Sequence, residues 1–71
     1  MEAYIKSLET ELSLIKNGFK EEERRALVDY KSNNHEYIKK LAFLAYKSDI
    51  YQVRMYGVFL FGFLSEQKDI L

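Results

Sequence analysis

The side chains that could do chemistry are few and scattered in this sequence. His35 is the only histidine and there is no cysteine, so thiolate metal sites and disulfide bonds are excluded. No pair of carboxylates accompanies His35 at ligand spacing, which favours an exposed place in the first turn of a helix over a metal site. No nucleophile–base pair and no phosphate-binding loop is present either. We therefore expect no catalytic residue, no cofactor and no metal ion in this chain.

Six tyrosines and five phenylalanines give the chain many aromatic rings that could stack on nucleic-acid bases. A stacking platform needs exposed rings beside basic side chains, whereas most of these rings fall in one apolar run. Eleven basic and eleven acidic residues also cancel, which leaves no overall field toward nucleic acid or an anionic membrane. The composition thus favours a core role for the rings and disfavours nucleic-acid binding by this chain alone.

The apolar run, Asp49 to Leu64, is the element around which the others must be arranged. Between Arg54 and Glu66 the only ionisable side chain is Tyr56, so a helix here must be covered on more than one side. Two glycines argue against a single buried strand. The uncharged segment is shorter than the roughly 20 residues that span a bilayer. We expect an inner helix that begins with a capping box of Asp49 and Gln52.

Within this inner helix, glycine placement and helical spacing indicate tight packing. Val53, Tyr56, Gly57, Leu60 and Leu64 share one face of the helix. Gly57 and Gly62 each cost about 1 kcal/mol relative to alanine in a helix, so both are expected to permit close approach by neighbouring helices.

Three helices are expected before it. Residues 2–17 form an outer helix with Gly18 as its left-handed C-cap, and an apolar stripe lies along it. That stripe lasts barely two heptads, which favours bundle packing over a coiled coil. Residues 20–31 form a short, lightly attached helix, expected to be the most mobile of the set. Its charge run is a solvated face with a Glu21–Arg25 pair, and the side chains available for burial are only Ala26, Leu27, Val28 and Tyr30. Residues 35–47 follow, capped by Asn33 or Asn34.

At the C-terminal end, Ser65 is expected to cap a further helix that residues 65–71 do not complete. The expected organisation is therefore a single all-α domain or N-terminal fragment, with charged cap helices over 1–31, a helix pair over 35–64 and an incomplete helix over 65–71. Either the rest of a longer protein or a second copy of the chain would cover the open side of the inner helix.

Length and composition limit the remaining choices. Seventy-one residues make at most one domain, which buries only about 60% of its unfolded surface. A content of 48% hydrophobic residues, no proline and three glycines suits an all-helical chain. The N-terminus lacks the pattern of a secretion signal, so a cytoplasmic location is the expectation.

The second helix of the 35–64 pair resembles a HEAT repeat. Asp49, then Val53-Arg54, Gly57-Val58 and Phe61-Gly62, and finally Leu64, follow the repeat pattern of aspartate, valine-arginine, small residue, leucine-glycine and leucine. Within that superfamily, the segment LAYKSDIYQVRMYGVFLFGFLSEQKD resembles the first full repeat of the DNA alkylation repair family, the HEAT-like alkylpurine DNA glycosylases. The similarity covers residues 35 to 70, and the helices before them fit the family's N-terminal cap only loosely.

The resemblance implies antiparallel helical hairpins in an α-α superhelix. It implies structural repeat roles for Asp49 as cap, for Arg54 as the arginine that bonds to the aspartate or carbonyls of a neighbouring repeat, and for Val53, Gly57, Leu60 and Leu64 in packing. A phosphate contact is the rival role for Arg54. The family's catalytic aspartate and tryptophan-lined cleft belong to later repeats, and this chain has no tryptophan. DNA binding is thus expected only through the parent protein.

Two rival functions remain. One is a protein-interaction or self-association module without a DNA role, in which the open face of the inner helix docks a partner. The other is a small dimeric helical bundle of unrelated ancestry.

Overall fold

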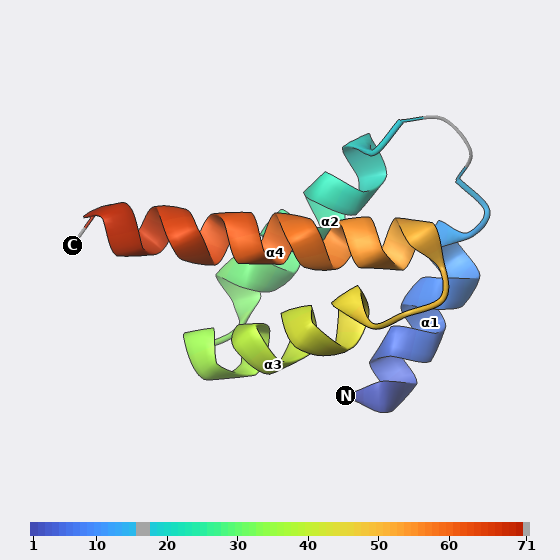
Figure 1. The fold of residues 1–71 in the computed structure, drawn as a ribbon, viewed down its shortest axis with the longest axis horizontal. Helices are drawn as coiled ribbons and strands as arrows, with labels where there is room; N and C mark the ends of the chain where they lie inside the picture. The colour runs from blue at the N-terminus through green and yellow to red at the C-terminus, as the bar shows by residue number, and fades with distance from the viewer. Residues whose placement is uncertain (16–17, 71) are drawn as a thin grey trace.

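The computed structural model describes residues 1–15 and 18–70, the last four of them by backbone alone, and the regular structure of these residues is entirely helical. This confirms the all-α class with four helices (Figure 1). The helices are α1 (Glu2–Leu12), α2 (Lys20–Ser32), α3 (His35–Tyr46) and α4 (Tyr51–Ile70).

Helix α4 is the centre of the arrangement, as its apolar sequence predicts. It runs the length of the molecule, with α3 antiparallel beside it, α2 crossing behind it and α1 near its first turns (Figure 1). Each of the other three helices packs against α4. The buried apolar side chains form one cluster: Leu8, Leu12, Ala26, Ile38, Leu41, Ala42, Ala45, Val53, Tyr56 and Leu60. Within the described residues, no helix is both long and apolar enough to cross a bilayer.

Helices α3 and α4 come very close together at Gly57. A Cβ atom at Gly57 would lie 3.0 Å from both the Ala42 carbonyl oxygen and the Tyr46 backbone nitrogen. Only a glycine therefore fits here without a shift of backbone, which confirms the expected close approach. At the other end of α3, the Asn34 side chain accepts a hydrogen bond from the Tyr37 N–H at 2.8 Å, so Asn34 is the N-cap.

Helix α1 ends at Leu12 and is shorter than predicted. The Ile15 N–H bonds to the Leu12 carbonyl at 3.0 Å, and the Ser13 hydroxyl donates to the Thr10 carbonyl, so local three-residue bonds close the helix. Gly18 has the expected left-handed backbone, with φ of +68°, but it lies too far along the chain to cap this helix. Lys16 and Asn17, which the prediction placed in the helix, lie outside the described residues.

Helix α2 is more firmly attached than the sequence predicted. It packs along α4 more extensively than α1 does, and its buried side chains are Glu22 and Ala26, whereas Leu27 and Val28 are exposed. The charge run also pairs differently. Arg24 bonds to Glu21 at 2.8 Å, while the guanidinium of Arg25 reaches α1. The sequence did not indicate that this face of α2 is buried, because one of its two buried side chains is the glutamate Glu22.

The C-terminal half of α4 also corrects the prediction. Ser65 lies inside the helix, which continues to Ile70, so residues 65–70 are not the start of a separate helix. No proline or glycine follows Gly62, and serine, glutamate, glutamine and lysine are all tolerated in helix interiors. Ser65 could serve as an N-cap, but the helix continues through it. Leu71 lies outside the described residues.

Candidate functional site

Arg54 is the residue with the most specific expected role, and its side chain faces the turn between α3 and α4. It is half-buried, its Nη1 donates to the Ser48 carbonyl at 2.9 Å, and its guanidinium lies 5.5 Å from the centre of the Tyr51 ring. The acceptor is a carbonyl of the same hairpin, where the resemblance implied a neighbouring repeat. In this chain Arg54 fastens the end of α3 to the beginning of α4.

Ser48 performs the local role that the sequence analysis gave to Asp49. Its hydroxyl accepts from the Ile50 N–H at 3.0 Å and donates to a carboxylate oxygen of Glu9 at 2.5 Å. Asp49 is exposed and α4 begins only at Tyr51, so the position before the first helical residue belongs to Ile50. The side chain of Gln52 donates to the Ile15 carbonyl at 2.9 Å. The predicted capping box is therefore wrong, because both of its partners are displaced by the later helix start.

The other repeat positions lie on the core side of α4. Val53, Gly57 and Leu60 are buried and Leu64 is half-buried against the core. Gly62 differs from Gly57, because no described atom outside its own helical surroundings lies within 4 Å of a Cβ built there. The expectation of a close neighbour at Gly62 is not met by any described part of this chain.

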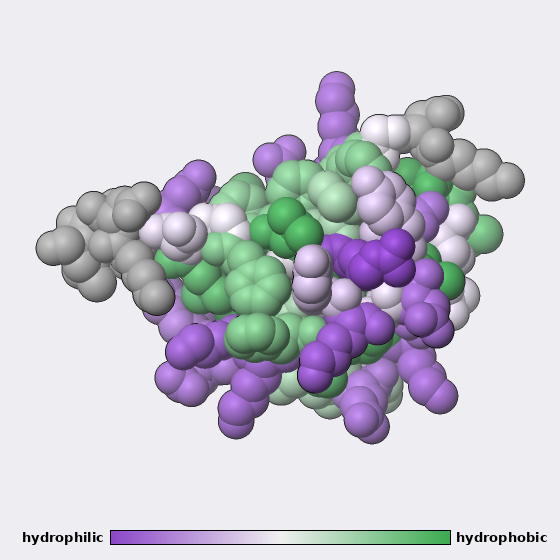
Figure 2. Space-filling view, in the orientation of Figure 1, coloured by the Kyte–Doolittle hydropathy of each residue, from purple (hydrophilic) through white to green (hydrophobic). Residues whose placement is uncertain are grey.

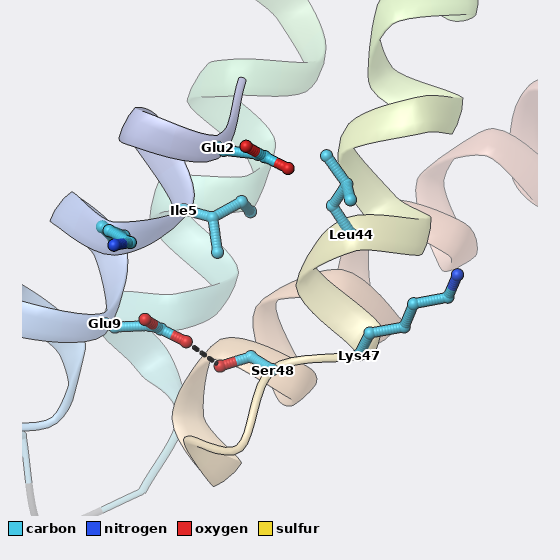
Figure 3. A pocket seen from close by; sticks show the side chains of 7 residues that line it. Glu2, Ile5, Glu9, Leu44, Lys47 and Ser48 are labelled. Atoms are coloured by element: carbon cyan, nitrogen blue, oxygen red, sulfur yellow. Dashed lines mark hydrogen bonds between the residues drawn. The ribbon is translucent and has the colours of Figure 1, made fainter.

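A shallow hollow of about 370 Å³ lies between α1 and the end of α3 (Figure 3). Its lining residues are Glu2, Ile5, Lys6, Glu9, Leu44, Lys47 and Ser48. Ile5 and Leu44 provide an apolar wall, and the Glu9 carboxylate is already engaged by Ser48 (Figure 3). The Ser48 hydroxyl in this hollow is held between Glu9 and the Ile50 N–H, so it serves the α3–α4 turn. The described residues include no group of three side chains able to hold a metal ion.

The sequence analysis missed a polar network that joins three helices. Tyr4 of α1 and Tyr56 of α4 both donate to the same carboxylate oxygen of Asp29 in α2, each at 2.5 Å. Burial, reinforced by the hydrogen bond to Asp29, raises the pKa of the fully buried Tyr56, so its hydroxyl remains a proton donor across the physiological range. Arg25 lies over the Tyr4 ring, 5.7 Å from its centre, and bonds to Glu11 at 2.9 Å. The network joins three helices at the edge of the core, because Tyr56 is buried, Tyr4, Arg25 and Asp29 are half-buried, and Glu11 is exposed.

The aromatic rings are divided between core and surface. Tyr56 is buried and Phe59, Phe61 and Phe63 pack partly against the core, as the apolar run predicts. Phe43 and Tyr46 of α3 are exposed and contact Phe61 edge-on, with ring centres 5.1 and 6.3 Å apart. Figure 2 shows apolar surface extending over the α3 and α4 side of the molecule. His35 is exposed, as predicted, and stacks on Tyr30.

Comparison with known proteins gives a specific relationship. No protein-family model matches the sequence, and no curated protein matches it significantly. Among solved structures, the crystal structure of AlkD2 from Streptococcus mutans is 70% identical to this chain and superposes with a TM-score of 0.90. That match covers 97% of this chain. The chain is AlkD-like.

A second crystal structure, of smu.31 from Streptococcus mutans UA159, is 66% identical over 96% of the chain, with a TM-score of 0.82. The resemblance to the DNA alkylation repair family is thereby confirmed, and it extends over α1 and α2, which the sequence matched only loosely. The AlkD-like chain spans about a third of each protein, 33% of AlkD2 and 31% of smu.31.

Proposed function

We propose that this chain is the N-terminal, structural segment of a DNA-alkylation-repair-like protein. In it α3 and α4 form a HEAT-like helix pair, and α1 and α2 cover that pair as a cap. The observation that supports this most directly is the 70% identity, over nearly the whole chain, to a third of AlkD2. The packing agrees with such a role, because the polar contacts described above join helices and do not surround a reaction cleft.

The catalytic part belongs, in this proposal, to the rest of the parent protein. In the family that this chain resembles, a catalytic aspartate and tryptophans line the cleft in later repeats. The chain has no tryptophan, and its half-buried aspartate, Asp29, is occupied by two tyrosine hydroxyls. We expect the 71-residue chain to release no alkylated base from duplex DNA when assayed beside AlkD2. Base release by the purified chain would contradict the proposal.

Arg54 acts in this proposal as a structural residue, with DNA contact as the rival role. Its bond to the Ser48 carbonyl and its position beside Tyr51 already hold the guanidinium on the turn. A salt titration with duplex DNA separates the roles, because affinity that depends on phosphate contacts falls as salt rises. We expect no binding by the chain at low salt, and a loss of thermal stability in Arg54→Ala. Salt-sensitive binding that Arg54→Ala removes would establish the DNA role.

A protein-interaction module is the second candidate, and the exposed apolar side chains favour it. Phe43, Tyr46, Tyr51 and Val58 are all exposed large hydrophobic residues. A module of this kind would bind a partner or a second copy and have no DNA role. Sedimentation of the purified chain at low micromolar concentration tests it. A stable dimer would favour the module, whereas a well-folded monomer would count against self-association.

A further inference from the structure

One side of α4 is apolar and is only partly covered by the described residues, since the Tyr51 ring meets Phe19 edge-on with 5.6 Å between ring centres. It comprises Tyr51, Met55, Val58 and Gly62, which succeed one another at helical spacing and which we call the outward stripe. Tyr51 is 54% exposed and Val58 is 41% exposed, while Met55 is half-buried and Gly62 is exposed. The opposite side of α4 carries the buried Val53, Tyr56 and Leu60. The helix is therefore built to be covered on both sides and is covered here on one.

The two glycines of α4 differ in whether another helix packs against them. At Gly57, the backbone and Ala45 of α3 come so close that an added Cβ would clash. At Gly62, the described chain offers nothing within 4 Å of such an atom. A glycine weakens a helix because it adds backbone freedom and no side-chain contact. Gly57 has a compensating contact in this structure, whereas Gly62 has none.

The missing contact has a natural source in the remainder of an AlkD-like protein. The chain matches AlkD2 over 97% of its own length but only 33% of AlkD2, so two-thirds of the related protein lies outside the match. In helical repeat proteins each unit buries its second helix against the next unit. We propose that the outward stripe receives a helix from the continuation of such a chain, and that this helix comes closest at Gly62. The inference rests on the function proposed above.

The stripe also defines the chemistry of that helix. Tyr51 already contacts Phe19 and Arg54, so the uncovered apolar surface centres on Val58 and Gly62. It requires an apolar facing side, with a large side chain seated over the gap at Gly62. Beyond Gly62 the stripe ends in the exposed Ser65 and Glu66, so the docking helix is polar or basic at that end. An apolar stripe that ends at an acidic residue fits a packed helix better than a nucleic acid, whose phosphates Glu66 would repel.

The test places this chain in a complete protein. Residues 1–71 replace the aligned third of AlkD2, and the melting temperature of this chimera is compared with that of its Gly62→Ala and Gly62→Leu variants. Overpacking at a close helix contact lowers the melting temperature, by about 5 °C or more for leucine. In the 71-residue chain alone, Gly62→Ala raises it, because the space is open there and alanine favours the helix. We therefore expect Gly62→Ala to lower the melting temperature of the chimera and to raise that of the isolated chain.

Controls keep the outcome specific. Lys40→Leu adds the same apolar side chain to an exposed position on α3 and is expected to change the melting temperature little in either setting. If the chimera folds and both Gly62 variants are tolerated, the contact is wrong while the proposed function stands. A chimera that does not fold overturns the proposed function and the contact with it. The 71-residue chain could instead form a dimer that Val58→Glu disrupts, while the chimera tolerates both Gly62 variants. That pair of results would assign the stripe to a second copy and overturn the proposal.

Discussion

Asp29 shows how much of this small fold depends on single polar side chains. One of its carboxylate oxygens accepts two tyrosine hydroxyls, from Tyr4 in α1 and from Tyr56 in α4. Hydrogen bonds to a charged acceptor are stronger than bonds between neutral groups, and a buried donor without an acceptor is costly. Asp29 therefore links three helices through one carboxylate oxygen.

Asp29→Ala is predicted to destabilise the chain by about 1–3 kcal/mol, because it leaves the buried hydroxyl of Tyr56 without its acceptor. Adding Tyr56→Phe to this variant removes the orphaned hydroxyl, so the double variant is expected to lose less than the two single variants together. Urea unfolding of the four proteins measures this. Additive losses would show that the two side chains act independently.

Glu22 is the opposite case, a carboxylate buried without a hydrogen-bond partner among the described residues. Burial raises its pKa above the ordinary value of 4.5, so the folded chain holds this proton more tightly than the unfolded chain. Glu22 therefore costs no stability below about pH 4, and its cost grows as the pH rises from there through the folded pKa.

Glu22→Gln is accordingly predicted to be more stable than the parent chain at pH 7, with an advantage that shrinks as the pH falls toward 4. Thermal unfolding across this range measures the difference. Glu23→Gln, at an exposed neighbouring position, is the matched control. An advantage of Glu22→Gln that is constant with pH would contradict a raised pKa for the buried Glu22 carboxyl group.

Gly57→Ala is predicted to cost about 1–3 kcal/mol, because the added methyl group meets two backbone atoms of α3 at 3.0 Å and backbone cannot move aside easily. Gly62→Ala in the same chain is predicted to gain up to about 1 kcal/mol. Both substitutions have the same intrinsic helix preference, so the difference between their midpoints in urea isolates the α3 contact. Equal effects would show that α3 and α4 are not in close contact at Gly57.

Among the helices, α1 has the weakest attachment. It packs less against the other helices than α2 or α3 does, and side-chain bonds from Tyr4, Glu9 and Glu11 hold it to the remaining helices. The sequence predicted that residues 20–31 would be the most mobile helix, because their charges suggested little burial. From the packing, we expect α1 to be the most mobile helix.

Amide hydrogen exchange is predicted to be fastest in α1 and slowest along the buried face of α3 and α4. Loss of a side-chain bond should accentuate this order, so Glu9→Ala, which removes the bond to Ser48, is expected to accelerate exchange in α1 more than in α2. Faster exchange in α2 than in α1 would restore the prediction made from the sequence.

The elements were easier to predict than their ends or their polar contacts. The apolar run fixed α4 as the inner helix, and Gly57 was correctly expected at a close contact, because both follow from local composition and spacing. The end of α1 at Leu12 and the passage of α4 through Ser65 depend on small energy differences between helix and turn, which serine does not decide by itself. The Asp29 network joins residues far apart in sequence, so no spacing indicated it.

At the scale of the whole molecule, the four helices form a small core with one bare side. Ten buried apolar side chains, three of them from α4, form this core, while most of the outward stripe and the exposed rings of α3 lie outside it. A domain of this size has little stability to spare. In the parent protein proposed above, a helix over the stripe would supply further burial.

The most direct measurement is calorimetric unfolding of the chimera in which residues 1–71 replace the aligned third of AlkD2. If this chain is a structural segment of an AlkD-like repeat protein, the chimera unfolds in one cooperative transition, at a higher temperature than the 71-residue chain alone. Two separate transitions, with the first at the melting temperature of the isolated chain, would show that its helices do not join the repeat array and would contradict the account.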